Sequence, residues 1–255
     1  MKNIVNVLFF TALLASCQPK GYTIEGNLSD ANANGKAYIE YPSFLKGPVM
    51  IDSTTITNGK FEFKGEVDKP ERYHILIDLN NSNDTSDSPN KKYQGELYID
   101  NSNITFTADI STATKSQWDS LLVIPNPEIS GSPTHDFYLS LNKEIASLTN
   151  ELKELNQRHL ELQADSTVNA DALQQSLQDK ENKKEQLLEL LKKNVTSIVA
   201  VNETVNVLSD KSIGFSAKQI ELLLGTFKKH WANTAQMVAL EFTAALAYPS
   251  RSITQ

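Results

Sequence analysis

Residues 51–67 read Ile51-Asp52-Ser53-Thr54-Thr55-Ile56-Thr57-Asn58-Gly59-Lys60-Phe61-Glu62-Phe63-Lys64-Gly65-Glu66-Val67. Polar and apolar residues alternate on both sides of the stretch, and this period places Phe61 and Phe63 on one face of an extended strand. Asn58-Gly59 separates the two runs, and both residues tolerate the positive φ angle that a tight hairpin turn requires. The stretch therefore predicts two β-strands joined by a short turn.

Similar strand signals surround this turn in the first half of the chain. They are short, they alternate in polarity, and residues that favour turns separate them: 22–26, 36–41, 49–56, 60–67, 73–77, 96–99 and 103–108. About six or seven such strands predict an antiparallel β-sandwich or small barrel. We assign residues 22–130 to this module.

The hydrophobic period changes to that of helices after residue 131. Apolar residues recur at alternating steps of four and three, which is the spacing of a heptad stripe: Leu141, Ile145, Leu148, Leu152, Leu155 and Leu162. His159 occupies the one polar position of this stripe. Such a stripe is typical of a coiled-coil seam and needs a partner helix. A second helical pattern follows after a short break, which predicts an antiparallel helical hairpin over about residues 134–192.

Three further helices are predicted over residues 195–208, 216–229 and 232–248. Ser216 is a candidate N-cap for the second of them, and Ser166 or Thr167 is a candidate cap for the second arm of the hairpin. The helical domain therefore covers residues 131–255. The predicted fold class is α+β, with the sheet module first and the helical hairpin and bundle after it.

The N-terminus has the pattern of a bacterial lipoprotein export signal. Lys2 precedes an apolar segment that ends in Leu14-Ala15-Ser16-Cys17, and Cys17 is the only cysteine in the chain. The apolar segment would reach about 18 Å as a helix, which is too short for the ~30 Å core of a bilayer. We predict a signal peptide over residues 1–16, lipidation of Cys17, and a lipidated tether over residues 17–21.

The alternative is an ordinary secretory leader with a coincidental cysteine. The tether carries no acidic cluster of the kind that directs some lipoproteins to the cell exterior. We therefore expect a protein of the cell envelope that is anchored by lipid to the outer membrane and faces the periplasm.

Composition limits the remaining classes of function. The chain has 24 Lys and Arg against 31 Asp and Glu, and the net charge of −7 disfavours nucleic acid as a partner. Hydrophobic residues make up 40%, which is typical of globular domains. Once Cys17 is acylated no thiol remains, so we expect no disulfide, no cysteine nucleophile and no thiolate metal site.

Residues 51–67, behind the lipoprotein signal, resemble the β-rich module of unknown function found near the N-terminus of Bacteroidota lipoproteins. In those proteins a thioredoxin-like domain of the TlpA and ResA kind follows. The likeness covers about residues 21–132, including Gly26, Pro70, the segment 97–108 and Ile129-Ser130-Gly131-Ser132. The resemblance implies an exported, anchored scaffold.

Redox chemistry in that family belongs to a Cys-x-x-Cys pair of the thioredoxin domain. The present sequence ends at Gln255, about where that domain would begin, and contains no such pair. The oxidoreductase activity is therefore not carried over to any residue of this chain.

Histidines are the first candidates for chemistry. His135 and Asp136 are adjacent, but neighbours on a helix point about 100° apart, so we favour Thr134 as a helix cap with Asp136 in the first turn. His74 lies in a strand and His159 on the heptad stripe, and we interpret both as partly buried or rim residues. The four histidines show no metal-ligand spacing.

Three other groups have a functional and a structural interpretation. One group is Lys228-Lys229-His230-Trp231, which could form a patch that binds an anionic ligand. We favour the structural interpretation, a positively charged last turn of a helix with Trp231 packed in the core. Tyr38, Tyr41, Phe44 and Tyr98 line a groove or, as we favour, belong to the core. Residues 78–89 begin like a calcium loop but lack its glycine and its final glutamate, so we expect no calcium site.

The sequence predicts a non-catalytic envelope lipoprotein that binds or scaffolds another component. Its partners would be the membrane, through the lipid anchor, and an envelope protein or a second copy, through the helical hairpin. We predict no catalytic residue, no metal and no cofactor. Two alternatives stay open: an accessory or truncated member of a thiol–disulfide system, and capture of a glycan or peptide by the sandwich face.

Overall fold

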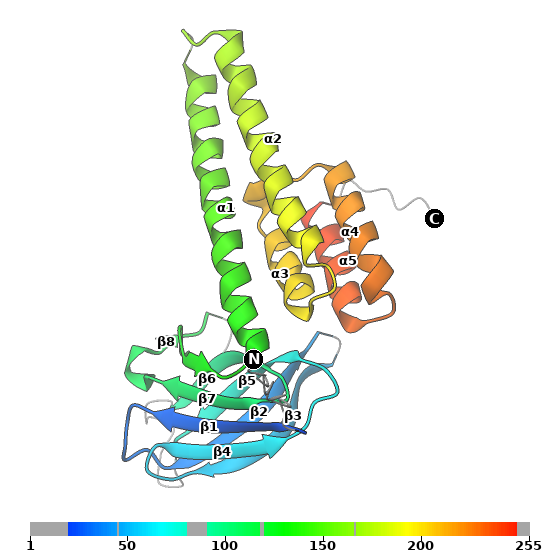
Figure 1. Ribbon diagram of the computed structural model, residues 1–255. Coiled ribbons are helices and arrows are strands. Elements are labelled where there is room, and N and C mark those ends of the chain that lie inside the picture. Colours follow the sequence, from blue (N-terminus) through cyan, green and yellow to red (C-terminus); the bar gives the residue numbers. More distant parts are fainter. Residues whose placement is uncertain (1–19, 45, 81–90, 118–119, 166, 249–255) are drawn as a thin grey trace, which may run out of the picture.

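The computed structural model describes residues 20–44, 46–80, 91–117, 120–165 and 167–248. The fold is α+β, as predicted: two packed β-sheets are followed by five α-helices in the described residues (Figure 1). Two of the helices form a long arm that rises from the sheets, and the other three pack beside its lower half (Figure 1).

The two sheets hold four and six strands. The smaller has the order β10-β7-β1-β4 and the larger the order β3-β2-β5-β6-β9-β8. The strand bounds are β1 Tyr22–Leu28, β2 Gly35–Ser43, β3 Gly47–Ile56, β4 Lys60–Gly65, β5 Glu71–Asp78, β6 Lys92–Ile99, β7 Asn103–Ala108, β8 Thr114–Lys115, β9 Leu122–Val123 and β10 Glu128–Ser130.

Both sheets are mixed, whereas the sequence predicted antiparallel pairing throughout. Most neighbours are antiparallel, but β1 pairs with β7 in parallel and β6 pairs with β9 in parallel. Alternation along a strand reports which face is buried and carries no information on the direction of its neighbour. The two parallel pairs therefore had no signal in the sequence.

The turn at Asn58-Gly59 is present, with φ angles of 51° and 73°. Thr57 and Lys60 close it through two backbone hydrogen bonds of 2.9 and 3.1 Å. Beyond this bridge the flanking strands separate: β3 pairs with β2 in the larger sheet, and β4 pairs with β1 in the smaller one. The turn thus connects the two layers, and Ile56 and Phe63 are buried in the core between them.

The arm consists of α1 (Pro133–Ala164) and α2 (Ala170–Lys193). At 32 residues, α1 is about 48 Å long. The heptad stripe of α1 is largely covered by α2, because Leu141 and Leu152 lie in one buried cluster with Leu187 of α2. Asn169 caps α2, because its side chain accepts a hydrogen bond from the Ala172 N–H. Thr167, one of the two predicted caps, is therefore not the cap. Ser166, the other predicted cap, lies outside the described residues.

His159 is buried in the arm, with 5% of its surface exposed, and is not a rim residue. Its Nδ1 lies 2.6 Å from the Ser176 hydroxyl, which also lies 2.8 Å from the Leu173 carbonyl. The direction of the hydrogen bond between His159 Nδ1 and the Ser176 hydroxyl depends on the imidazole tautomer. The one polar member of the stripe therefore has a partner across the hairpin.

The remaining helices are α3 (Ile198–Ser209), α4 (Ala217–Trp231) and α5 (Ala235–Ala247), and two short 3₁₀ helices span Ile110–Thr112 and Lys211–Ile213. Ser216 caps α4 in a capping box with Gln219, as predicted for Ser216. Trp231 packs on the helical core and donates from Nε1 to the Val195 carbonyl at 2.6 Å, as the favoured interpretation expected. In the described part of the chain, no helix is long and apolar enough to span a bilayer.

Candidate functional site

Tyr98 of β6 joins the larger sheet to the helices. Its ring is fully buried and belongs to the hydrophobic core of the helical part, although its backbone lies in the sheet. The phenol oxygen accepts a hydrogen bond from Asn202 of α3 at 3.2 Å. Burial raises the pKa of the Tyr98 phenol, which keeps the group neutral.

The start of α1 is held against the same strand. Ser132 is the N-cap: its hydroxyl oxygen accepts from the His135 N–H at 3.1 Å, and Pro133 takes the first helical position. The predicted cap at Thr134 is wrong, because Thr134 is the second residue of the helix that Ser132 caps. The Thr134 N–H donates to the carboxylate of Asp100 at 2.9 Å. Burial alone would raise the pKa of Asp100, but hydrogen bonds from Ser102 and Thr134 outweigh it and hold the pKa below its usual range.

His135 and Asp136 do not form an acid/base pair, in agreement with the favoured interpretation. His135 is buried, whereas Asp136 is exposed. The His135 Nδ1 accepts the Tyr98 backbone N–H at 3.3 Å, and burial lowers the pKa of the imidazole. The side chain is therefore neutral with its proton on Nε2.

A row of ionisable side chains crosses the outer face of the larger sheet. The strand register places His74 of β5 opposite Glu40 of β2 on one side and opposite Glu96 of β6 on the other. The His74 Nδ1 lies 3.3 Å from a Glu40 oxygen, and Nε2 lies 3.9 Å from a Glu96 oxygen. Arg72, on the same face of β5, approaches Glu96 to 3.8 Å.

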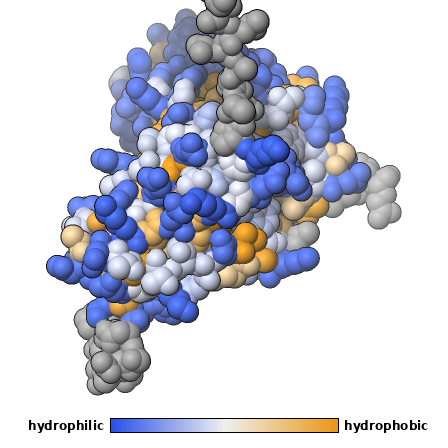
Figure 2. All heavy atoms as spheres, turned by 60° about the horizontal axis from the view of Figure 1, so that its bottom comes forward, coloured by the Kyte–Doolittle hydropathy of each residue, from blue (hydrophilic) through white to orange (hydrophobic). Residues whose placement is uncertain are grey.

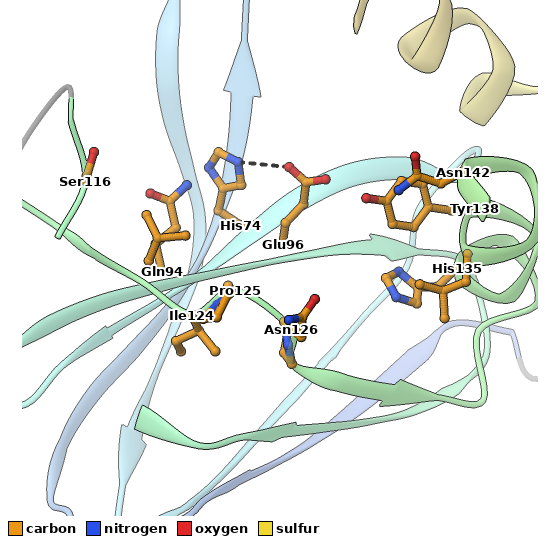
Figure 3. Close-up of a pocket in the computed structure, with 14 residues that line it drawn as sticks. His74, Gln94, Glu96, Ser116, Ile124, Pro125, Asn126, His135, Tyr138 and Asn142 are labelled. Carbon is orange, nitrogen blue, oxygen red and sulfur yellow. Dashed lines mark ion pairs between the residues drawn. The ribbon is translucent and has the colours of Figure 1, made fainter. Parts of the chain in front are cut away.

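This row borders a pocket of about 600 Å³ between the sheet and α1. Its walls carry polar side chains from the strands and the helix and apolar ones from the segment 123–127: His74, Gln94, Gly95, Glu96, Ser116, Val123, Ile124, Pro125, Asn126, Pro127, His135, Tyr138, Leu139 and Asn142. Figure 3 shows Tyr138 and Asn142 extending from the helix and His74 and Glu96 turned toward each other on the strands. The volume is in the range of small-ligand sites.

The pocket is suited to hydrogen bonding. Side-chain amides of Gln94, Asn126 and Asn142 both donate and accept, and Glu96 adds a carboxylate. The His74 Nδ1 lies within hydrogen-bond distance of the Glu40 carboxylate, at 3.3 Å, whereas Nε2 lies 3.9 Å from Glu96, beyond that distance. Across the described ranges, no group of three His, Cys, Asp or Glu side chains has a metal-binding arrangement.

A buried carboxyl lies on α3, close enough to the larger sheet to interact with the charges of Glu96 and Arg72. Glu203 of α3 is 5% exposed, and burial raises its pKa, with the nearby charge of Glu96 acting in the same direction and Arg72 opposing it. Asn206 donates to the Glu203 carboxyl at 3.1 Å. The charged form of Glu203 is therefore costly in the folded protein.

We expect Glu203→Gln to stabilise the protein at pH 7 by about 1 kcal/mol, since an amide keeps the bond to Asn206 without a buried charge. The pKa of Glu203 is higher in the folded than in the unfolded protein. The wild-type protein is therefore most stable below the unfolded-state pKa, where the carboxyl is protonated in both states. It loses this stability as the pH rises through the folded-state pKa. The gain measured by urea unfolding should therefore shrink toward pH 4. Glu154→Gln, on the exposed face of α1, is the control, and a gain independent of pH would contradict the explanation.

The lipoprotein residues Leu14, Ala15, Ser16 and Cys17 lie outside the described residues, as does most of the segment that resembles a calcium loop. The four aromatic residues proposed for one groove are not brought together. Tyr98 is buried, Tyr41 packs on Tyr73, Phe44 packs on Phe242, and Tyr38 lines a separate hollow with Met50.

Sequence reasoning missed the row of Glu40, His74 and Glu96. Each occupies an outward position in an alternating strand, so the face is readable from the sequence. Their adjacency is not, because Glu40 and His74 are 34 residues apart and meet only through the pairing of β2 with β5.

A family model described as a domain of unknown function (DUF4369) matches residues 22–138. The match covers the two sheets and the first turns of α1, so it includes the Ser132 cap and the pocket residues His135 and Tyr138. The predicted β-rich module of unknown function is confirmed to this extent. Comparisons with curated proteins and with solved structures gave no match.

Proposed function

We propose that this chain is a membrane-anchored, non-catalytic lipoprotein of the cell envelope that acts as a binding or scaffolding module. The observation that carries the proposal is the pocket between the larger sheet and α1, whose lining offers hydrogen-bonding groups suited to recognition. Its walls come from both halves of the molecule, so a ligand there would contact the sheet and the helices at once.

The location rests on the N-terminal pattern that ends at Cys17 and on the resemblance to Bacteroidota lipoproteins. A periplasm-facing outer-membrane anchor follows from the tether sequence. An envelope protein or a second copy at the helical arm is the proposed macromolecular partner, because the arm projects beyond the other helices (Figure 1).

Capture of a glycan or a peptide is the specific binding activity that the pocket favours. Gln94, Asn126 and Asn142 present planar amides, and Tyr138 presents an aromatic ring beside them. These groups match neutral hydroxyls and peptide amides better than a multiply charged anion, since the lining contains Glu96 and neither lysine nor arginine.

Asn142→Leu is the direct test. The full-length processed protein in detergent is titrated with neutral oligosaccharides and with short peptides, and binding is followed by calorimetry. Loss of the amide should weaken the best probe about tenfold, the worth of one or two hydrogen bonds. Asn150→Leu, an exposed position farther along α1, is the matched control.

Two results would contradict the proposal. One is the absence of saturable binding for every oligosaccharide and peptide probe. The other is reduction of insulin disulfides by the purified protein, which would place the chain among thiol–disulfide enzymes.

A further inference from the structure

An apolar patch lies where the sheets meet α5. Val238, Phe242 and Leu246 follow one another at four-residue spacing, which places them on one side of α5, and they are 41%, 51% and 61% exposed. Phe44, at the turn between β2 and β3, is 49% exposed and packs edge-on against Phe242 with ring centroids 5.5 Å apart. We call these four side chains the α5 patch.

The same hairpin carries more exposed apolar surface. Val49, Met50 and Ile51 of β3 follow directly after the turn that bears Phe44. Together with the α5 patch they account for seven of the twelve exposed large apolar side chains in the described residues. The β3 residues point alternately to the two faces of their strand, whereas the α5 patch is grouped by one side of α5 and by the contact of Phe44 with Phe242. A group of this kind marks an interaction surface, whereas single exposed apolar residues are ordinary. Figure 2, turned so that the end with the sheets comes forward, shows several orange apolar areas among blue and white ones.

The strand register puts the N-terminal tether at the same end of the sandwich as this patch. Tyr22 is the first residue of β1, and the next residue, Thr23, pairs in parallel with Asn103 at the start of β7, just after β6 ends at Ile99. Ile99 in turn pairs with Glu71, which starts β5. β2 runs antiparallel to β5, so its last residue and the following Phe44 lie at the Glu71 end. The start of α5 lies there too, because Gln236 donates to the Glu71 carboxylate at 3.1 Å.

The tether is too short to let this end leave the membrane. Gly21 is packed against the Gly65 carbonyl, since a Cβ at Gly21 would lie 2.2 Å from that oxygen. Only four residue steps separate Gly21 from Cys17, which is a reach of about 14 Å for an extended chain. A lipid on Cys17 therefore keeps the end that bears the α5 patch close to the bilayer.

We propose that the α5 patch inserts into the membrane surface to which Cys17 is anchored, so that the protein is held by its lipid and by apolar side chains together. This inference rests on the lipid anchor of the proposed function. The α5 patch lies in the membrane interface between lipid headgroups and acyl chains, where apolar helix faces are buried about 5–10 Å deep. The pocket beside His74 and the helical arm then have a fixed orientation relative to the bilayer.

Site-directed spin labelling tests the proposal, because acylation of Cys17 leaves no other thiol in the chain. The lipidated Leu246→Cys variant is labelled and reconstituted into phosphatidylcholine–phosphatidylglycerol vesicles. Leu160→Cys, at a leucine of α1 that is 59% exposed and lies toward the tip of the arm, is the matched control. Vesicle flotation is measured on the same samples.

The proposal predicts that the label at position 246 is accessible to oxygen and shielded from a water-soluble nickel relaxant, whereas the label at position 160 shows the opposite. If the protein floats with the vesicles and both labels are in water, membrane insertion is overturned and the lipid anchor stands. If the label at position 246 is shielded from both relaxants and shows dipolar coupling to a second label, another copy covers the patch and the proposal is overturned. Failure to float, with a free thiol at Cys17, overturns the anchor and the inference together.

Discussion

Cys17→Ser is expected to release the protein from the membrane. A serine oxygen cannot form the thioether that carries the diacylglyceryl group. The remaining apolar contacts cannot replace two or three acyl chains, since even one myristoyl chain binds bilayers with only about 10⁴ M⁻¹. In a bacterial host with lipoprotein processing, the wild-type chain should pellet with membranes and the variant should stay in the soluble fraction.

The control for this experiment is Ser16→Ala, which keeps a small side chain at the cleavage position and should leave the protein in the membrane fraction. Mass spectrometry of the mature wild-type N-terminus should show acylated Cys17. A Cys17→Ser protein that resists extraction from membranes by carbonate would show that another part of the chain anchors it.

Tyr98→Ala is expected to cause the largest loss of stability among single substitutions at the sheet–helix contact. The ring is fully buried in the helical core, so its removal leaves a cavity and should cost about 3–5 kcal/mol. It also removes the hydroxyl that binds Asn202. Because this side chain couples two cores, urea unfolding followed by far-ultraviolet and tyrosine signals should change from one transition to two.

Tyr98→Phe separates the two contributions. It keeps the ring and loses only the bond to Asn202, so it should cost about 1 kcal/mol and preserve a single transition. If Tyr98→Ala also costs less than about 1 kcal/mol, the contact between the sheets and the helices depends on other residues, such as Glu71 and Gln236.

The candidate site could be predicted only in part. The N-terminal pattern is local, so lipidation of Cys17 can be predicted from the sequence, and it stays a prediction because Cys17 lies outside the described residues. The pocket, in contrast, gathers side chains from β5, β6, the segment 123–127 and α1. His135 shows the difference clearly: the sequence placed it near a helix start, but its bond to the Tyr98 backbone depends on where β6 lies.

The sequence by itself determined the elements whose causes are local. Alternation around Asn58-Gly59 specified strands and a turn, the stripe through Leu141 and Leu152 specified a helix with a partner, and Ser216 specified a helix start. Only the tertiary structure decided that the strands on either side of Asn58-Gly59 enter different sheets, that two strand pairs are parallel, and that Glu40, His74 and Glu96 form a row. The physical reason is that backbone propensity and hydrophobic period act over a few residues, whereas the choice of neighbouring strand depends on burying every apolar face at once.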